Sequence, residues 1–172
     1  RAILHRLVEN LGLVPRGAVA AHIDGLAPAA RKRLAALGVR IGRVGVFLPG
    51  LRGARSVALR VLLASVHGRD RSEARARLDA ALRKMPPALA KPRGIPAAVF
   101  NGAGYLALDG RALRIDAAER LAEQAAVLAR QGPFVPTPSL ARSTGIPEAM
   151  LAEALKGLGF VSEKISRNGG EG

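Results

Sequence analysis

Four prolines within eleven residues place the strongest limit on how this chain can fold: Pro86, Pro87, Pro92 and Pro96. Proline lacks a backbone N–H, and its ring clashes with the preceding helical turn, so a regular helix is excluded from residues 86 to 96. We therefore expect this segment to be a crossing or a linker. It separates a region of helical patterns from a region of short apolar runs.

Before the prolines, the apolar residues recur mostly at helical spacing. Four helices are predicted, over 2–11, 28–38, 54–67 and 70–84. Gly12 ends the first of them. Pro28 begins the second. Residues 39–48 alternate like a strand instead, and the alternation changes parity at Gly42 and Arg43. A parity change of this kind predicts a bulge or a tight bend.

After the prolines, residues 97–115 read as short strands with glycine turns, over 97–100, 105–108 and 112–115. Asp109 and Gly110 between two apolar runs predict a hairpin. Asp116 with Glu119 predicts a capped helix to about residue 131. Two short helices, at 138–144 and from Pro147 to Leu158, resemble a helix-turn-helix.

The predicted fold is thus mainly α with short β-strands, an α+β class. Four regions are expected: a basic helix-and-strand region (1–85), a proline-rich crossing with short strands (86–115), a helical unit (116–161) and a flexible tail (162–172).

The sequence lacks the residues that several kinds of catalytic and binding site require. The chain has no cysteine, no phosphate-binding P-loop motif and no apolar run of eighteen residues. His5, His22 and His67 lack the spacing of metal ligands, and no acid/base pair is evident. We therefore predict no catalytic, cofactor or metal site in this chain, no membrane span and a cytoplasmic location. Because residue 1 is arginine and no signal peptide follows, we expect a fragment of a larger protein.

The net charge of +14 suggests a polyanionic partner. A GC-rich genome is the alternative source, since arginine outnumbers lysine 22 to 5. The distribution of charge separates the two explanations better than the total does. Residues 1–60 carry +9, residues 61–115 carry +6, and residues 116–172 carry −1.

The 45 residues between Asp24 and Asp70 contain no acid at all, where the chain average predicts about three. We predict that cations of this stretch bind a phosphate backbone; a solvated arginine-rich face is the alternative. The predicted nucleic-acid-binding residues are Arg31, Lys32, Arg33, Arg40, Arg43, Arg52, Arg55 and Arg60. Phe47 is a candidate for base stacking, although a lone Phe in a strand is more often part of the core.

Two other functions stay open. The helix-turn-helix-like unit would read duplex DNA as a regulator, but its second helix carries Glu148 and Glu153 against Lys156, and phosphates would repel it. A protein–protein adaptor would instead expose a large apolar patch.

Three segments resemble a known family. They are LGVRIGRVGVFLP at 37–49, ALRIDAAERLA at 112–122 and FVPTPSLARSTGIPEAMLAEALKGLGF at 134–160. These segments are similar to the C-terminal region of alphaproteobacterial helicase-like proteins. That group is similar to the mitochondrial degradosome RNA helicases of superfamily two.

The resemblance implies an ATP-driven helicase whose two RecA-like motor domains precede residue 1, with ATP and magnesium bound there. Every motor motif is missing from this chain, so no catalytic residue is carried over, and whether the chain takes part in an enzyme stays open. What remains would be an accessory region that guides a single strand, with RNA as the expected ligand, across the motor domains.

Overall fold

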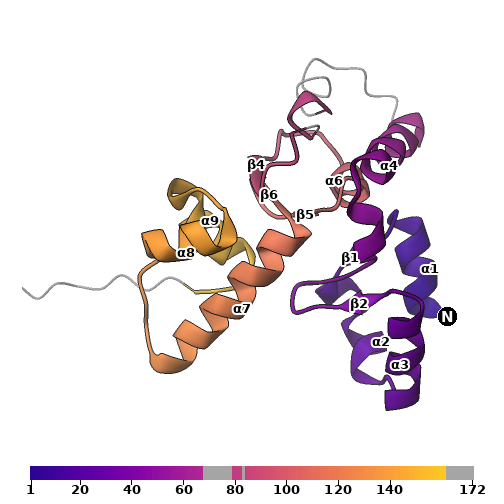
Figure 1. Cartoon of the computed structure of the whole chain (residues 1–172), viewed down its shortest axis with the longest axis horizontal. Helices are drawn as coiled ribbons and strands as arrows, with labels where there is room; N and C mark the ends of the chain where they lie inside the picture. Colours follow the sequence, from indigo (N-terminus) through magenta and orange to yellow (C-terminus); the bar gives the residue numbers. More distant parts are fainter. Residues whose placement is uncertain (68–78, 83, 162–172) are drawn as a thin grey trace, which may run out of the picture.

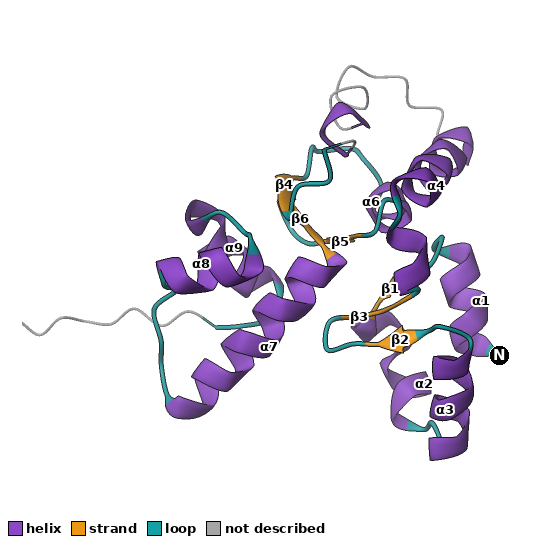
Figure 2. Cartoon of the chain, viewed as in Figure 1, coloured by secondary structure: helices purple, strands orange, loops and turns teal. Residues whose placement is uncertain are grey.

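The computed structural model describes residues 1–67, 79–82 and 84–161. Helices dominate, and two small three-stranded antiparallel sheets lie between them, so the predicted mainly helical α+β class is confirmed (Figures 1 and 2). Most of the helix predicted over 70–84 and the whole tail at 162–172 lie outside the described residues. No helix among the described residues has both the length and the apolar character that a membrane span requires.

The N-terminal unit joins helices to the first sheet. Its helices are α1 (Ala2–Glu9), α2 (Ala20–Asp24) and α3 (Pro28–Ala36), with 3-10 turns at Arg16–Val19 and Pro49–Arg52. Its strands are β1 (Leu13–Pro15), β2 (Arg40–Ile41) and β3 (Gly45–Phe47), in the order β1-β3-β2. One apolar core holds the unit together: Ile3, Leu7, Val14, Val19, Ile23, Leu34, Val39 and Val46.

The predicted bend at Gly42 and Arg43 is confirmed. It divides the apolar run into β2 and β3, which pair with Arg40 opposite Phe47 and Ile41 opposite Val46. The N–H of Gly42 donates to the carbonyl of Gly45 at 2.8 Å and closes the turn. The change of parity in the sequence therefore marks a reversal of the chain.

The middle of the chain forms the second sheet. It contains α4 (Ala54–His67), β4 (Ala88–Ala90), α6 (Ala97–Gly102), β5 (Tyr105–Ala107) and β6 (Arg111–Arg114), with strand order β4-β6-β5. The hairpin at Asp109 and Gly110 is confirmed, because β5 and β6 are antiparallel neighbours. Tyr105 is fully buried, and its hydroxyl donates to the carbonyl of Pro86 at 2.7 Å. Burial raises the pKa of Tyr105 to about 12, although the charge of Arg114 opposes the rise.

The strand predicted over 97–100 is wrong, because these residues begin α6. Pro96 precedes the first helical residue, where its missing N–H costs nothing, and two alanines follow. Val99 and Phe100 are buried on the inner face of this helix. Four apolar residues in a row fit a short buried helix as well as a strand, and here packing decides.

The C-terminal unit consists of α7 (Ile115–Gln131), α8 (Pro138–Thr144) and α9 (Glu148–Gly157). Their apolar faces meet around Leu121, Leu140 and Leu151. The predicted capping pair at the start of α7 is wrong, since no side chain caps this helix. Asp116 forms ion pairs with Arg114 and Arg120 instead, and the carboxylate of Glu119 accepts a hydrogen bond from the N–H of Arg43, outside its own helix.

A small apolar cluster connects the N-terminal unit to α7. Leu13 of β1 and Phe47 of β3 are buried against Ile115, and Val44 packs beside them. Phe47 is only 4% exposed, so it belongs to the core and does not offer its ring to a base. This contact brings the turn between β2 and β3 next to the first turns of α7 (Figure 1).

Candidate nucleic-acid interface

Six of the eight predicted cations lie on the surface of the N-terminal unit and at the start of α4: Arg31, Lys32, Arg33, Arg40, Arg43 and Arg55. Within the part of the chain that the structure describes, none of the six forms an ion pair with a carboxylate. The acid-free segment thus leaves these charges without a counterion of their own. The side chain of Arg52 lies outside the described residues.

Three of the cations are consecutive residues of α3. Successive residues of a helix point about 100° apart, so Arg31, Lys32 and Arg33 fan over a broad arc of its surface. Arg31 also donates to the carbonyl of Ile23 at 2.8 Å, at the end of α2. Only Leu34 is buried in this helix, so α3 is an exposed outer layer of the unit that carries three charged residues.

Arg40 lies on β2, just before the bend between β2 and β3, and Arg43 lies in the bend. Arg40 is exposed on β2, an edge strand that pairs with β3 alone. Arg43 is exposed in the turn itself. Two guanidinium groups three residues apart on one edge can contact neighbouring phosphates of a flexible strand.

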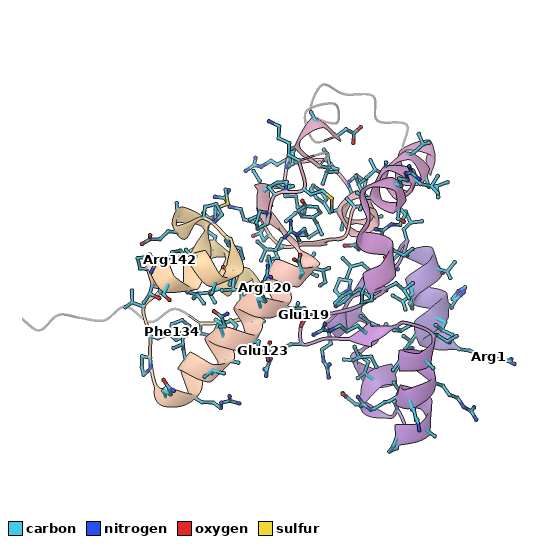
Figure 3. All side chains as sticks on the ribbon, viewed as in Figure 1. Arg1, Glu119, Arg120, Glu123, Phe134 and Arg142 are labelled. Carbon is cyan, nitrogen blue, oxygen red and sulfur yellow. The ribbon has the colours of Figure 1, made fainter. Side chains whose placement is uncertain are left out.

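The turn that carries Arg43 is held on two sides. Arg16 donates from its backbone N–H to the carbonyl of Val44 at 2.9 Å and from its guanidinium to the carbonyl of Gly42 at 2.8 Å. On the other side, the carboxylate of Glu119 accepts from the N–H groups of Arg43, Val44 and Gly45 at 2.7, 3.1 and 3.1 Å. Figure 3 shows Glu119 on the face of α7 toward this turn. The backbone beneath Arg43 is therefore fixed.

Sequence reasoning missed both Arg16 and Glu119. Arg16 lies outside the acid-free stretch, and the spacing of Glu119 from Asp116 predicts half of a helix cap. The one local signal is Gly42: a Cβ atom there would overlap the Glu119 carboxylate. A glycine beside an arginine in a bend is consistent with many turns, so this signal does not point to a glutamate 77 residues away.

Arg60 lies inside the protein, unlike the six exposed cations. It is 7% exposed, and its guanidinium donates to the backbone carbonyls of Ser56, Leu11 and Leu51. Burial lowers the pKa of this group, and among the described residues no carboxylate forms an ion pair with it. Because its donors are used within the fold, we leave Arg60 out of the interface.

The start of α4 adds Arg55, exposed in a first turn that contains no acid. In Figure 1, α3, the strand pair and the start of α4 follow one another along the N-terminal unit. Because these elements carry the six exposed cations, the cations are distributed along the unit. An arrangement of this kind suits a long polyanion better than a single small anion.

The helix-turn-helix-like unit offers a different surface. Gly145, at φ +73, connects α8 to α9, and Leu151, Ala154 and Leu155 of α9 are buried. Glu153 forms an ion pair with Arg111 of β6 at 2.5 Å. The exposed charges of α9 are thus two glutamates and one lysine, a poor match to a phosphate backbone.

The exposed apolar side chains that an adaptor would need gather on α4. Leu59, Leu62 and Leu63 are 57%, 60% and 43% exposed. This helix leads directly into residues 68–78, which lie outside the described part of the chain. The adaptor function stays a hypothesis.

Comparisons with family models, with curated proteins and with solved structures gave no match.

Among residues 1–67, 79–82 and 84–161, no three His, Asp or Glu side chains lie close enough together to hold a metal ion.

Proposed function

We propose that this chain is the nucleic-acid-binding accessory region of a cytoplasmic ATP-dependent helicase. In this proposal it holds a single strand, with RNA as the preferred ligand, along Arg31, Lys32, Arg33, Arg40, Arg43 and Arg55. ATP and magnesium act in motor domains outside this sequence. The observation that carries the proposal is that these six side chains are exposed and that none forms an ion pair with a carboxylate among the described residues, while Arg16 and Glu119 hold the turn that carries Arg43.

The arrangement favours a single strand over a duplex. A flexible strand can bend to meet cations spread over α3, the strand edge and α4, whereas a rigid duplex presents its phosphates at fixed positions. Contacts of this kind give affinity without sequence preference.

Titration of a short fluorescent oligouridylate between about 50 and 200 mM KCl tests the proposal. The logarithm of the binding constant is expected to fall with the logarithm of salt concentration by about 0.7 for each phosphate contact. Replacing Arg40, Arg43 and Arg55 together by Gln removes three contacts. The slope then flattens by about 2 units, and affinity falls roughly 100-fold at low salt.

The matched control removes the same number of charges from the C-terminal unit, by replacing Arg130, Arg142 and Lys156 with Gln. All three are exposed. The proposal expects this variant to bind within about threefold of the wild type. An equal loss of affinity in both variants would mean that only the total charge of the chain matters, not the position of the cations. Undetectable binding of the wild type at low salt would contradict the proposal outright.

A further inference from the structure

The turn between β2 and β3 has the geometry of an anion-binding site. Three successive backbone N–H groups, of Arg43, Val44 and Gly45, converge on a single carboxylate. Successive N–H groups that point into one concavity form a nest, a structure that binds phosphates and other anions in many proteins. Here the anion is the side chain of Glu119, from 74 to 76 residues further along the chain.

The nest has supports that do not depend on Glu119. The N–H of Gly42 donates to the carbonyl of Gly45, and β2 and β3 continue the pairing. Arg16 holds the carbonyls of Gly42 and Val44 from the other side. We therefore expect the three N–H groups to keep their direction when the carboxylate leaves.

The packing between the units also has a second support. Leu13, Phe47 and Ile115 are buried together beside the turn, and Glu119 itself is only half-buried. A change of the Glu119 rotamer would uncover the nest while the apolar contact between β1, β3 and α7 remains.

We propose that this nest is a phosphate subsite of the nucleic-acid interface, and that Glu119 occupies it until a backbone phosphate takes its place. Phosphodiester oxygens accept the same N–H hydrogen bonds as a carboxylate and carry the same single negative charge. The exposed guanidinium of Arg43 lies on the same residue as the first donor and adds attraction for the phosphate. This inference rests on the proposed function and assigns its central phosphate contact.

Competition of this kind discriminates between ligands. Glu119 is part of the same molecule, so its effective concentration at the nest is high, and a free phosphate ion competes poorly. A strand that also engages Arg40 and the cations of α3 gains the extra binding energy needed to displace it. Glu119 therefore lowers the apparent affinity and favours long polyanions over small ones.

Glu119→Gln tests the inference, and Glu123→Gln is its matched control. Glu123 lies one turn further along α7, is exposed and carries the same charge. Both variants remove one negative charge from the same helix, but only the first releases the nest. We expect Glu119→Gln to bind the oligouridylate about 10-fold more tightly than the wild type, and Glu123→Gln to stay within about twofold. Glu119→Ala, which leaves no acceptor at the nest, should bind at least as tightly as Glu119→Gln.

Nuclear magnetic resonance reads the nest directly, with inorganic phosphate as the probe. In Glu119→Gln, the amide signals of residues 43–45 should shift and saturate with phosphate, and in Glu123→Gln they should not. In the wild type, the oligouridylate should shift the carboxyl carbon signal of Glu119. This measurement needs no variant, so it holds even if a substitution weakens folding.

Each contrary result has its own meaning. Weaker oligonucleotide binding by Glu119→Gln would make Glu119 a clamp that supports the interface, and would overturn the inference. Equal tightening by both variants would reduce the effect to general electrostatics and overturn it too. If the wild type binds no oligonucleotide, the proposed function fails. The phosphate titration of Glu119→Gln then tests by itself whether the nest binds an anion.

Discussion

Arginines at the edge of the first sheet and arginines around the second sheet are used in opposite ways. The guanidinium groups of Arg40 and Arg43 form no ion pair with a carboxylate among the described residues. Arg111, Arg114 and Arg120 each hold a carboxylate of the C-terminal unit. The number of arginines therefore says little about where a polyanion binds. The placement of the few acids decides which guanidinium groups stay available.

The pairs around the second sheet connect elements of the fold. Arg114 holds both oxygens of Asp116, at 2.6 and 3.0 Å, and also donates to the carbonyl of Met85. Arg120 reaches the same carboxylate at 3.4 Å. Burial acts to raise the pKa of Asp116, but Arg114 and Arg120 outweigh it, and the pKa falls below its usual value. These contacts fix the junction between β6 and α7.

Substitution of Arg60 should give the largest effect on stability and the sharpest contrast with the surface cations. Arg60→Ala removes a buried side chain that donates to three partly buried backbone carbonyls. We expect the free energy of unfolding to fall by about 3–5 kcal/mol, because unsatisfied buried groups are costly. Urea denaturation followed by circular dichroism measures the change.

Arg55→Ala is the control, one helical turn and one residue earlier on α4 and exposed. It should change stability by less than about 0.5 kcal/mol and weaken oligonucleotide binding. A stable Arg60→Ala variant that loses only oligonucleotide binding would place Arg60 in the interface. The distinction between buried Arg60 and the exposed cations would then be wrong.

Arg114→Ala should rank second. It removes a two-point ion pair with Asp116 and the hydrogen bond to Met85, in a half-buried position. We expect a loss of about 2 kcal/mol, since hydrogen bonds to charged groups contribute more than neutral ones. Arg142→Ala, at an exposed position of α8, should cost less than about 0.5 kcal/mol. Equal losses would mean that the pair around the second sheet is no more structural than a surface charge.

The local patterns of the sequence predicted most helices of the described chain and the bend between β2 and β3. They did so because helical spacing, Pro at a helix start and glycine turns act over a few residues. Residues 97–100 show the limit of this reasoning. Their short apolar run was interpreted as a strand, and burial of Val99 and Phe100 on one helical face decided otherwise.

Long-range partners could not be predicted in the same way. Glu119 has the spacing of a capping residue relative to Asp116, yet its carboxylate binds amides of residues 43–45. Arg60 is one of the arginines of the acid-free stretch, yet its guanidinium donates to the backbone carbonyls of Leu11 and Leu51. Both outcomes depend on how the N-terminal unit packs on α4 and α7, and no window of the sequence contains that packing.

Acid should weaken the junction around Asp116. The folded pKa of Asp116 lies below its usual value, so the unfolded chain binds the proton more tightly. The stabilisation is therefore present above about pH 4 and is lost as the pH falls through the folded pKa. Asp116→Asn should reduce the free energy of unfolding by about 1 kcal/mol near pH 6, and the difference should shrink toward pH 3. A difference that stays constant with pH would show that the charge of Asp116 contributes nothing.

Lys156→Gln should give the smallest effect, and it tests whether the helix-turn-helix-like unit reads duplex DNA. Lys156 is exposed on α9, where Glu148 and Glu153 outnumber it. We expect affinity for either a duplex or an oligouridylate to change by less than about twofold, whereas Arg43→Gln should weaken oligouridylate binding about 5-fold. A duplex-binding regulator would show the reverse order, with sequence preference lost on Lys156→Gln. In that case the carboxylates of the C-terminal unit would be orienting a reading helix, and the unpaired arginines of the N-terminal unit would be a solvated face.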